Sequence, residues 1–233
     1  MLDGRFAVTP GLSIVGDVPT VYAAIDFESP FSDQTSEERS SAFVLGNPYL
    51  GVEAALPNPR GRASAGLGGR LPVVGTLIDL GDEDGTALFY SQFASYDRFL
   101  AFIPNTLSVV GTAEGSLALS PTVSLVGRLA PQLAINAGNE QSLPDDLELF
   151  LSYTFRAEAE AGPALLTGGI RATGFLTEEL GDDVARFETA IGLAAEVKAG
   201  TVRPGFFVEV PVGGNLDDLL DAVAGVGLGV DLN

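Results

Sequence analysis

Residues 146–177 read DLELFLSYTFRAEAEAGPALLTGGIRATGFLT, and this stretch decides the fold class. Apolar side chains occupy every second position from Leu147 to Phe155, and most positions between them are polar or charged. Such period-two alternation is typical of a β-strand with one apolar and one polar face. A tight turn at Gly162 follows, and a second arm alternates again from Leu166. Each arm is about 11–12 residues long, close to the ~9–11 residues with which a tilted strand crosses a bilayer.

The same alternation recurs along most of the chain and predicts an all-β fold. We expect eleven strands, at residues 5–15, 21–27, 49–56, 62–72, 107–119, 123–136, 147–158, 166–176, 185–198, 202–212 and 222–232. Residues 16–19 are interpreted as a turn and the polar residues 29–41 as a loop. Short connections near residues 17, 58, 120, 162 and 200 alternate with longer ones. Strands joined in this way predict an antiparallel up-and-down transmembrane barrel of 10–12 strands.

The strand count raises a difficulty, because single-chain bacterial barrels usually contain an even number of strands. Two interpretations restore an even number. Either an N-terminal strand is missing, which gives twelve strands, or Arg5 to Phe27 is one long strand with a bulge near Asp17, which gives ten. We expect residues 1–233 to form a single barrel domain with an insertion at residues 82–104.

That insertion follows a different period. Apolar side chains recur at spacings of three and four from residue 86, which predicts a helix over 86–102 that ends before Pro104. Three placements remain open for this helix: a lid over the barrel mouth, a plug inside the lumen, or the membrane interface. Its aromatic residues are the candidates for a gate or plug, namely Phe89, Phe93, Tyr96 and Phe99.

Composition excludes several classes of function. The chain of 233 residues has 31 acidic and 12 basic residues, a net charge of −19, so we expect no nucleic-acid partner. It contains no cysteine and no histidine, which removes thiolate ligands and the commonest general base. We therefore expect no enzymatic activity, no cofactor and no metal site. The beginning of the sequence has no apolar signal core, so we expect any export signal to be absent from this numbering.

The polar parity of the strands indicates which face is enclosed. It combines small residues with a nearly balanced set of arginine and glutamate, although the chain as a whole is strongly acidic. Confined charges need partners, so a balanced set favours a shared interior. The candidate pore-lining residues are Arg62, Arg70, Glu114, Arg128, Glu148, Arg156, Glu158, Arg171, Arg186, Glu188, Arg203 and Glu209. They would either fill the lumen with ion pairs or form a charged constriction.

The opposite parity suits lipid, because it consists of Leu, Val, Ile, Phe and Ala, and a closed sheet can expose such a face to hydrocarbon. The candidates for an aromatic girdle are Tyr49, Tyr153, Phe155, Phe187 and Phe206. A soluble lipocalin-like barrel, with the apolar parity inside, is the less favoured alternative.

Two segments carry a family resemblance. Gly46 to Glu53, followed by the glycine-rich Ala65 to Pro72, resembles the Gram-negative outer-membrane barrels of the phenol-degradation MetA-like transporter group. The last strand departs from the usual pattern of such barrels, because it ends Asp231-Leu232-Asn233 and not with an aromatic residue. The resemblance implies an outer-membrane location, a bilayer or detergent environment, and passage of small solutes.

Two functions therefore compete on the sequence. The first is a passive porin-like pore or transporter. The second is a non-conducting barrel that serves as an anchor, with its loops as a docking surface. The sequence names no permeant and no protein partner.

Overall fold

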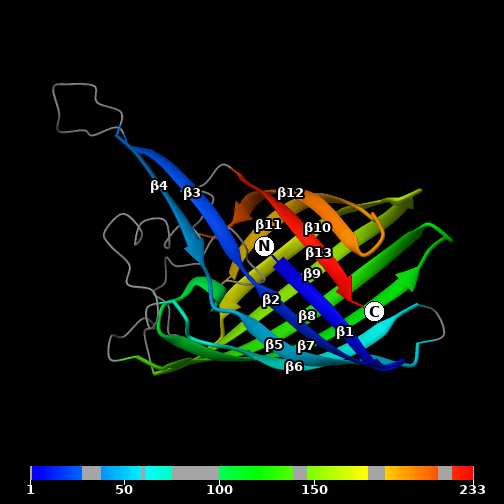
Figure 1. Ribbon diagram of the computed structural model, residues 1–233, viewed down its shortest axis with the longest axis horizontal. Helices are drawn as coiled ribbons and strands as arrows, with labels where there is room; N and C mark the ends of the chain where they lie inside the picture. The colour runs from blue at the N-terminus through cyan, green and yellow to red at the C-terminus, as the bar shows by residue number, and fades with distance from the viewer. Residues whose placement is uncertain are drawn as a thin grey trace.

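The computed structural model describes residues 2–27, 38–58, 61–74, 100–138, 146–177, 187–214 and 222–232. Within these ranges the chain is almost entirely β-structure, as the alternation predicts (Figure 1). No helix among the described residues has the length and apolar character needed to span a membrane.

Thirteen strands fall within the described ranges. Their bounds are β1 Leu2–Thr9, β2 Leu12–Val18, β3 Thr20–Phe27, β4 Glu38–Leu45, β5 Tyr49–Leu56, β6 Ala63–Arg70, β7 Thr106–Ala118, β8 Val123–Asn136, β9 Leu147–Ala161, β10 Ala164–Phe175, β11 Phe187–Val197, β12 Val202–Gly213 and β13 Val223–Leu232. Of these described strands, eleven close into a barrel in the order β1-β13-β12-β11-β10-β9-β8-β7-β6-β5-β2, which confirms the predicted fold class. The central hairpin, β9 and β10, pairs from Ala161–Ala164 at its turn to Phe150–Phe175 at its open end.

The barrel closes through one parallel pair, and this resolves the problem of the odd strand count. Residues Leu2 to Phe6 of β1 run parallel to Leu228 to Leu232 of β13, while the other barrel neighbours are antiparallel. The proposal that Arg5 to Phe27 is one long strand is therefore wrong, and the described strands close without a twelfth. The first turn lies at Pro10-Gly11 and not at residues 16–19, so Arg5 to Val15 is a hairpin, with Arg5 paired to Val15 itself. A Pro-Gly pair favours a turn over a continuous strand.

A two-stranded ribbon extends the sheet beyond the barrel. β3 and β4 pair only with each other among the described strands, from Thr20–Leu45 to Phe27–Glu38 (Figure 1). The ribbon begins where Pro19 follows β2, and the Gly46 amide donates to the Pro19 carbonyl at 2.8 Å. Proline offers no ladder N–H, so it interrupts the barrel edge at this point. Residues 38–41 were expected in a loop, and that expectation is wrong because they belong to β4.

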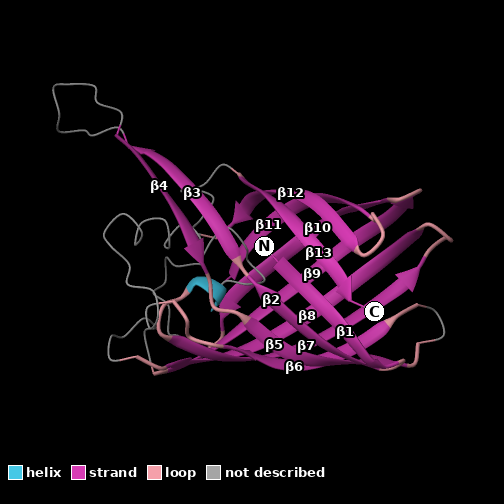
Figure 2. Cartoon of the chain, in the orientation of Figure 1, coloured by secondary structure: helices cyan, strands magenta, loops and turns pink. Residues whose placement is uncertain are grey.

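The two ends of the barrel differ in their connections. Short turns join β1 to β2, β5 to β6, β7 to β8, β9 to β10 and β11 to β12, at the end on the right in Figure 1. The longer connections all leave from the opposite end, which we call the long-loop end. Most of the predicted helix over 86–102 lies outside the described residues. Its last part, residues 100–102, forms a single 3₁₀ turn at the long-loop end (Figure 2).

The apolar parity of the strands faces outward. Leu50, Leu193 and Val226 are 65%, 67% and 80% exposed, and they come from widely separated strands. The polar parity faces inward, where Arg70, Gln132 and Glu148 are at most 4% exposed. The barrel therefore has an apolar outer surface and a polar interior, the reverse of a barrel that packs a hydrophobic core.

Candidate functional site: the barrel interior

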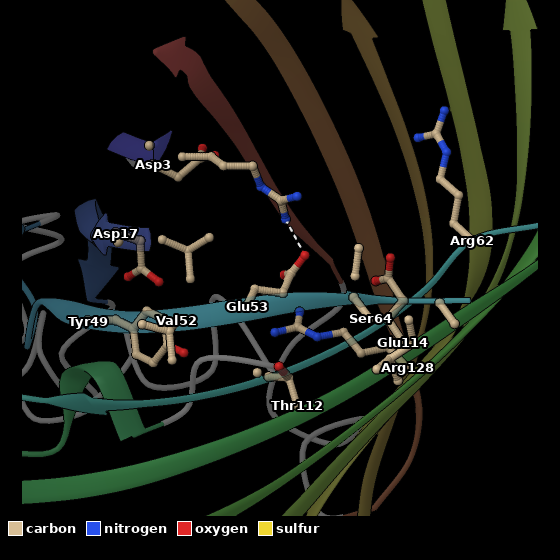
Figure 3. Close-up of a pocket in the computed structure, with 18 of the residues that line it drawn as sticks. Asp3, Asp17, Tyr49, Val52, Glu53, Arg62, Ser64, Thr112, Glu114 and Arg128 are labelled. Atoms are coloured by element: carbon tan, nitrogen blue, oxygen red, sulfur yellow. Dashed lines mark hydrogen bonds and ion pairs between the residues drawn. The ribbon is translucent and has the colours of Figure 1, made fainter. Parts of the chain in front are cut away.

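A cavity of about 770 Å³ occupies the interior towards the short-turn end. It extends from Asn58 and Arg62, beside a short turn, to Asp17 and Tyr49 further inside the barrel. Figure 3 shows Asp17, Glu53, Glu114 and Arg128 reaching this space from different strands. Acids on β1, β2, β5, β7 and β9 and arginines on β1, β8 and β12 line it, so both signs of charge reach the cavity.

Ion pairs within one strand and across the lumen wall neutralise much of this lining. Arg156 bridges two acids, with Glu158 at 2.8 Å and Glu114 at 3.3 Å. Arg171 pairs with Glu209, and both side chains are largely buried. Further pairs join Arg5 to Glu53 at 2.7 Å, Arg203 to Glu196 at 3.7 Å and Arg203 to Asp3 at 4.0 Å. Charges confined to a narrow interior need such partners, because each would otherwise lose its hydration without compensation.

The other predicted lining residues lie at several levels of the barrel. Arg62 is exposed at the short-turn rim, where Figure 3 shows it apart from the other labelled side chains. Arg128 lines the cavity, and Glu188 lies on the inward parity of β11, near Gly214. Glu148 is fully buried near the long-loop end, far from the Arg156 pairs along β9. Arg186 and the four gate candidates, Phe89, Phe93, Tyr96 and Phe99, lie outside the described residues.

The interior also contains an aromatic side chain that was expected outside. The expectation that Tyr49 belongs to an outer girdle is wrong, because its ring lies in the interior with the Arg70 guanidinium 5.4 Å from its centroid. A Cβ on Gly68 would lie 2.5 Å from the Tyr49 hydroxyl, so the glycines of this wall leave room for the ring. Tyr153, Phe155 and Phe206 do face outward, each more than a third exposed.

The long-loop end of the interior is filled by the chain itself. Residues Leu100 to Ile103 are at most 4% exposed, and Leu100 and Ile103 pack against inward-facing residues of the barrel wall. Those wall residues are Ala134 of β8, Phe150 of β9 and Phe175 of β10. The Phe150 and Phe175 rings lie with their centroids 4.4 Å apart. We call residues 100–105 the plug segment, because they occupy the barrel mouth above the cavity.

One buried side chain, Asn47, holds the plug segment to the wall. Its amide nitrogen donates to the carbonyls of Ile103 at 2.8 Å and Leu100 at 3.4 Å, and its backbone amide donates to Ala101 at 2.5 Å. Its side-chain oxygen accepts from the Val74 amide at 2.9 Å. All of these groups are withdrawn from water, so each bond satisfies backbone that would otherwise be unpaired.

Arg70 supports Asn47 from the side of the cavity. Arg70 donates to the Asn47 carbonyl at 3.0 Å and to both carboxylate oxygens of Asp17, at 2.9 and 3.2 Å. The Arg70 and Asp17 side chains are 5% and 10% exposed. A bidentate pair of this kind fixes orientation as well as charge. Arg70 therefore connects Asn47, which holds the plug segment, to the wall formed by β2, β5 and β6.

A polar layer lies between the plug segment and the charged cavity. Gln132 of β8 donates to Ser152 of β9 at 2.9 Å, and Ser152 shares a 2.7 Å hydrogen bond with Thr173 of β10. These three side chains are at most 6% exposed. Along β9 the lining thus changes from charged at Arg156, through neutral polar at Ser152, to apolar at Phe150, with the buried Glu148 beyond it.

Sequence reasoning missed the residues that close the mouth. Asp17 was assigned to a turn and Asn47 only to the start of a strand. The Asn47 side chain contacts residues 53 and 56 positions away in the sequence, so no local pattern marks it. The one sign in the sequence is that Asn47 follows a polar segment and precedes Pro48, a position where a strand is interrupted.

No model of a protein family matches this chain, and no curated protein sequence matches it. Fold and interior therefore define its class: a closed β-barrel with an apolar outer surface, a charged interior and an occupied mouth.

Proposed function

We propose that this chain is an outer-membrane β-barrel that acts as a passive pore for small solutes. The observation that carries the proposal is the sidedness of the barrel: exposed aliphatic side chains outside and paired charges inside. Every strand pair in hydrocarbon must satisfy its backbone, and a closed barrel does so. Short turns at one end and longer connections at the other are also the layout of outer-membrane barrels.

The cavity supports passage of small polar solutes. Its volume of about 770 Å³ is lined by both signs of charge, and these are largely neutralised by neighbours. A lining whose charges are held in ion pairs discriminates by size and polarity more than by the sign of the charge. The resemblance to the MetA-like transporter barrels points to the same class of activity.

The plug segment favours a second candidate, a non-conducting barrel that serves as an anchor or docking platform. Leu100 and Ile103 fill the lumen at the level of Phe150, so a solute that crosses must move them aside. The two candidate functions differ in whether the plug segment moves aside to let a solute pass.

Conductance through a planar bilayer tests both candidates. We expect small or intermittent currents from the wild-type barrel and at least severalfold larger currents from Asn47→Ala, which loses the bonds to Leu100 and Ile103. The matched control is Asn58→Ala, whose amide bonds Arg62 and Ser116 at the short-turn end, and it should behave as wild type. Absence of current from the folded wild type and from folded Asn47→Ala would reject the pore and leave the anchor.

A further inference from the structure

Glu148 differs from seven other inward-facing acids of the described chain. Asp3, Asp17, Glu53, Glu114, Glu158, Glu196 and Glu209 each form an ion pair with an arginine. Glu148 is 0% exposed, yet its one described side-chain bond comes from the Thr177 hydroxyl, which donates to Oε2 at 2.5 Å. Within the described residues its other oxygen, Oε1, is buried without a donor. Burying a carboxylate in this way is costly unless a cation accompanies it.

A second buried oxygen lies on the adjacent strand. Asn136 Oδ1 is also buried and has no donor within the described residues. The Asn136 amide donates to the Asp146 carbonyl at 3.0 Å, and Ala134 pairs with Glu148, so Asn136 and Glu148 are diagonal neighbours on β8 and β9. Both belong to the inward parity, and side chains in this relation on one face lie within reach of each other.

A third oxygen-bearing side chain lies at the rim. Asp146 is exposed and precedes Glu148 by two residues, the spacing that places two side chains on the same face of an extended chain. The three residues offer two carboxylates and one amide oxygen, and within the described part of the chain no donor reaches Glu148 Oε1. Oxygen-only sets of this kind suit hard divalent cations, above all Ca²⁺, which accepts irregular geometry and additional water ligands.

We propose that the long-loop mouth binds a calcium ion between Glu148, Asn136 and Asp146. The ion neutralises the buried carboxylate and satisfies the Asn136 oxygen, and the exposed Asp146 gives it a route from solvent. It also ties β8 to β9 at the level of Ala134, which contacts the plug segment. The site therefore stiffens the wall against which Leu100 and Ile103 pack.

Calcium-dependent melting of the full-length barrel, folded in detergent and freed of metal with a chelator, tests this proposal. We expect CaCl₂ to raise the melting temperature of the wild type in a saturable way, and Glu148→Gln to weaken the apparent affinity at least tenfold. Glu160→Gln is the matched control, because Glu160 is an exposed acid on the same strand that pairs with Lys198 at the opposite rim. It should respond to calcium as the wild type does.

Asn136→Ala keeps the test decisive if Glu148→Gln fails to fold, and it should lower the affinity for calcium severalfold. If calcium leaves the wild-type melting temperature unchanged, the proposal is overturned. An equal response of wild type, Glu148→Gln and Asn136→Ala would overturn it as well. The measurement needs no current, so its result is independent of whether the barrel conducts.

Discussion

Inward glycines determine which larger side chains the barrel can hold. Gly51 and Gly68 lie beside the Tyr49 ring, and Gly225 gives room to the inward ring of Phe207. The small residues of the polar parity were assigned to an enclosed face from composition alone, and these contacts supply the reason. At each of these glycines, atoms of the same or the adjacent strand take the space that a Cβ would fill, so the glycine and the aromatic ring pack against each other.

Gly51→Ala should destabilise the barrel by about 1–3 kcal/mol, the usual cost of overpacking. A Cβ there would overlap Tyr49 and lie 2.9 Å from the Leu67 carbonyl, so the ring and the Arg70 guanidinium above it must move. Denaturant unfolding of the detergent-folded protein measures the change. Gly115→Ala, where a Cβ meets nothing within 4 Å, is the control and should unfold at the same denaturant concentration as wild type.

Removal of the Arg156 side chain tests whether the lining charges select ions. Arg156→Ala leaves Glu114 and Glu158 without their described partner, so the cavity becomes more negative. We expect the reversal potential in a salt gradient to shift towards cation selectivity, with a similar shift for Arg171→Ala, which releases Glu209. Arg62→Ala, at the exposed rim, should shift it less. If ion selectivity is unchanged in both interior variants, these ion pairs serve only to hold the strands in register.

At the scale of elements, the plug segment packs against the open end of the central hairpin. Phe150 faces inward and packs against Leu100 and Ile103, whereas Phe155 on the same strand faces outward and is 53% exposed. Phe150→Ala should therefore increase conductance, and it should cost about 3–5 kcal/mol of stability through the cavity it leaves. Phe155→Ala should leave conductance unchanged. Equal currents from the two variants would show that packing on Phe150 does not hold the mouth closed.

The elements that the sequence predicts well are those with long, regular alternation. The turns near residues 58, 120, 162 and 200 lie where they were expected, because each separates two strands whose alternation is unambiguous. Pro10-Gly11 was missed because Phe6, Val8, Leu12 and Ile14 keep the same parity across the turn, so the alternation shows no break there. β4 was missed because its polar first residues resemble a loop.

The interior site is less predictable than the strands. Alternation places Arg156, Arg171 and Glu209 on the inward face, but it does not specify which acid each arginine meets. Arg156, for example, pairs with Glu158 on its own strand and with Glu114 on β7, two strands away. Partner choice depends on strand register and on side-chain length, which a periodic pattern does not encode.

At the scale of the whole molecule, the sidedness of the barrel leads to a prediction about its surroundings. If the outer surface faces hydrocarbon, a charge near the middle of a strand is costly, and one near a turn is not. Leu193 lies near the middle of β11 and is 67% exposed, whereas Leu119 follows the end of β7 and is 58% exposed. The two positions share chemistry and exposure and differ mainly in their distance from the barrel rim.

Leu193→Arg should lower the stability of the barrel in lipid vesicles by about 2–4 kcal/mol, and Leu119→Arg by about 0–1 kcal/mol, because the cost of a charge depends on its depth in the bilayer. Folding yield and denaturant unfolding in vesicles of phosphatidylcholine measure both values. In a soluble barrel an outward arginine meets water at either position, so both variants would then be as stable as wild type. That outcome would remove the bilayer from the proposed function. A penalty at Leu193 alone would support a bilayer around the barrel, so any solute that crosses the membrane through this protein would pass through the lumen and past the plug segment.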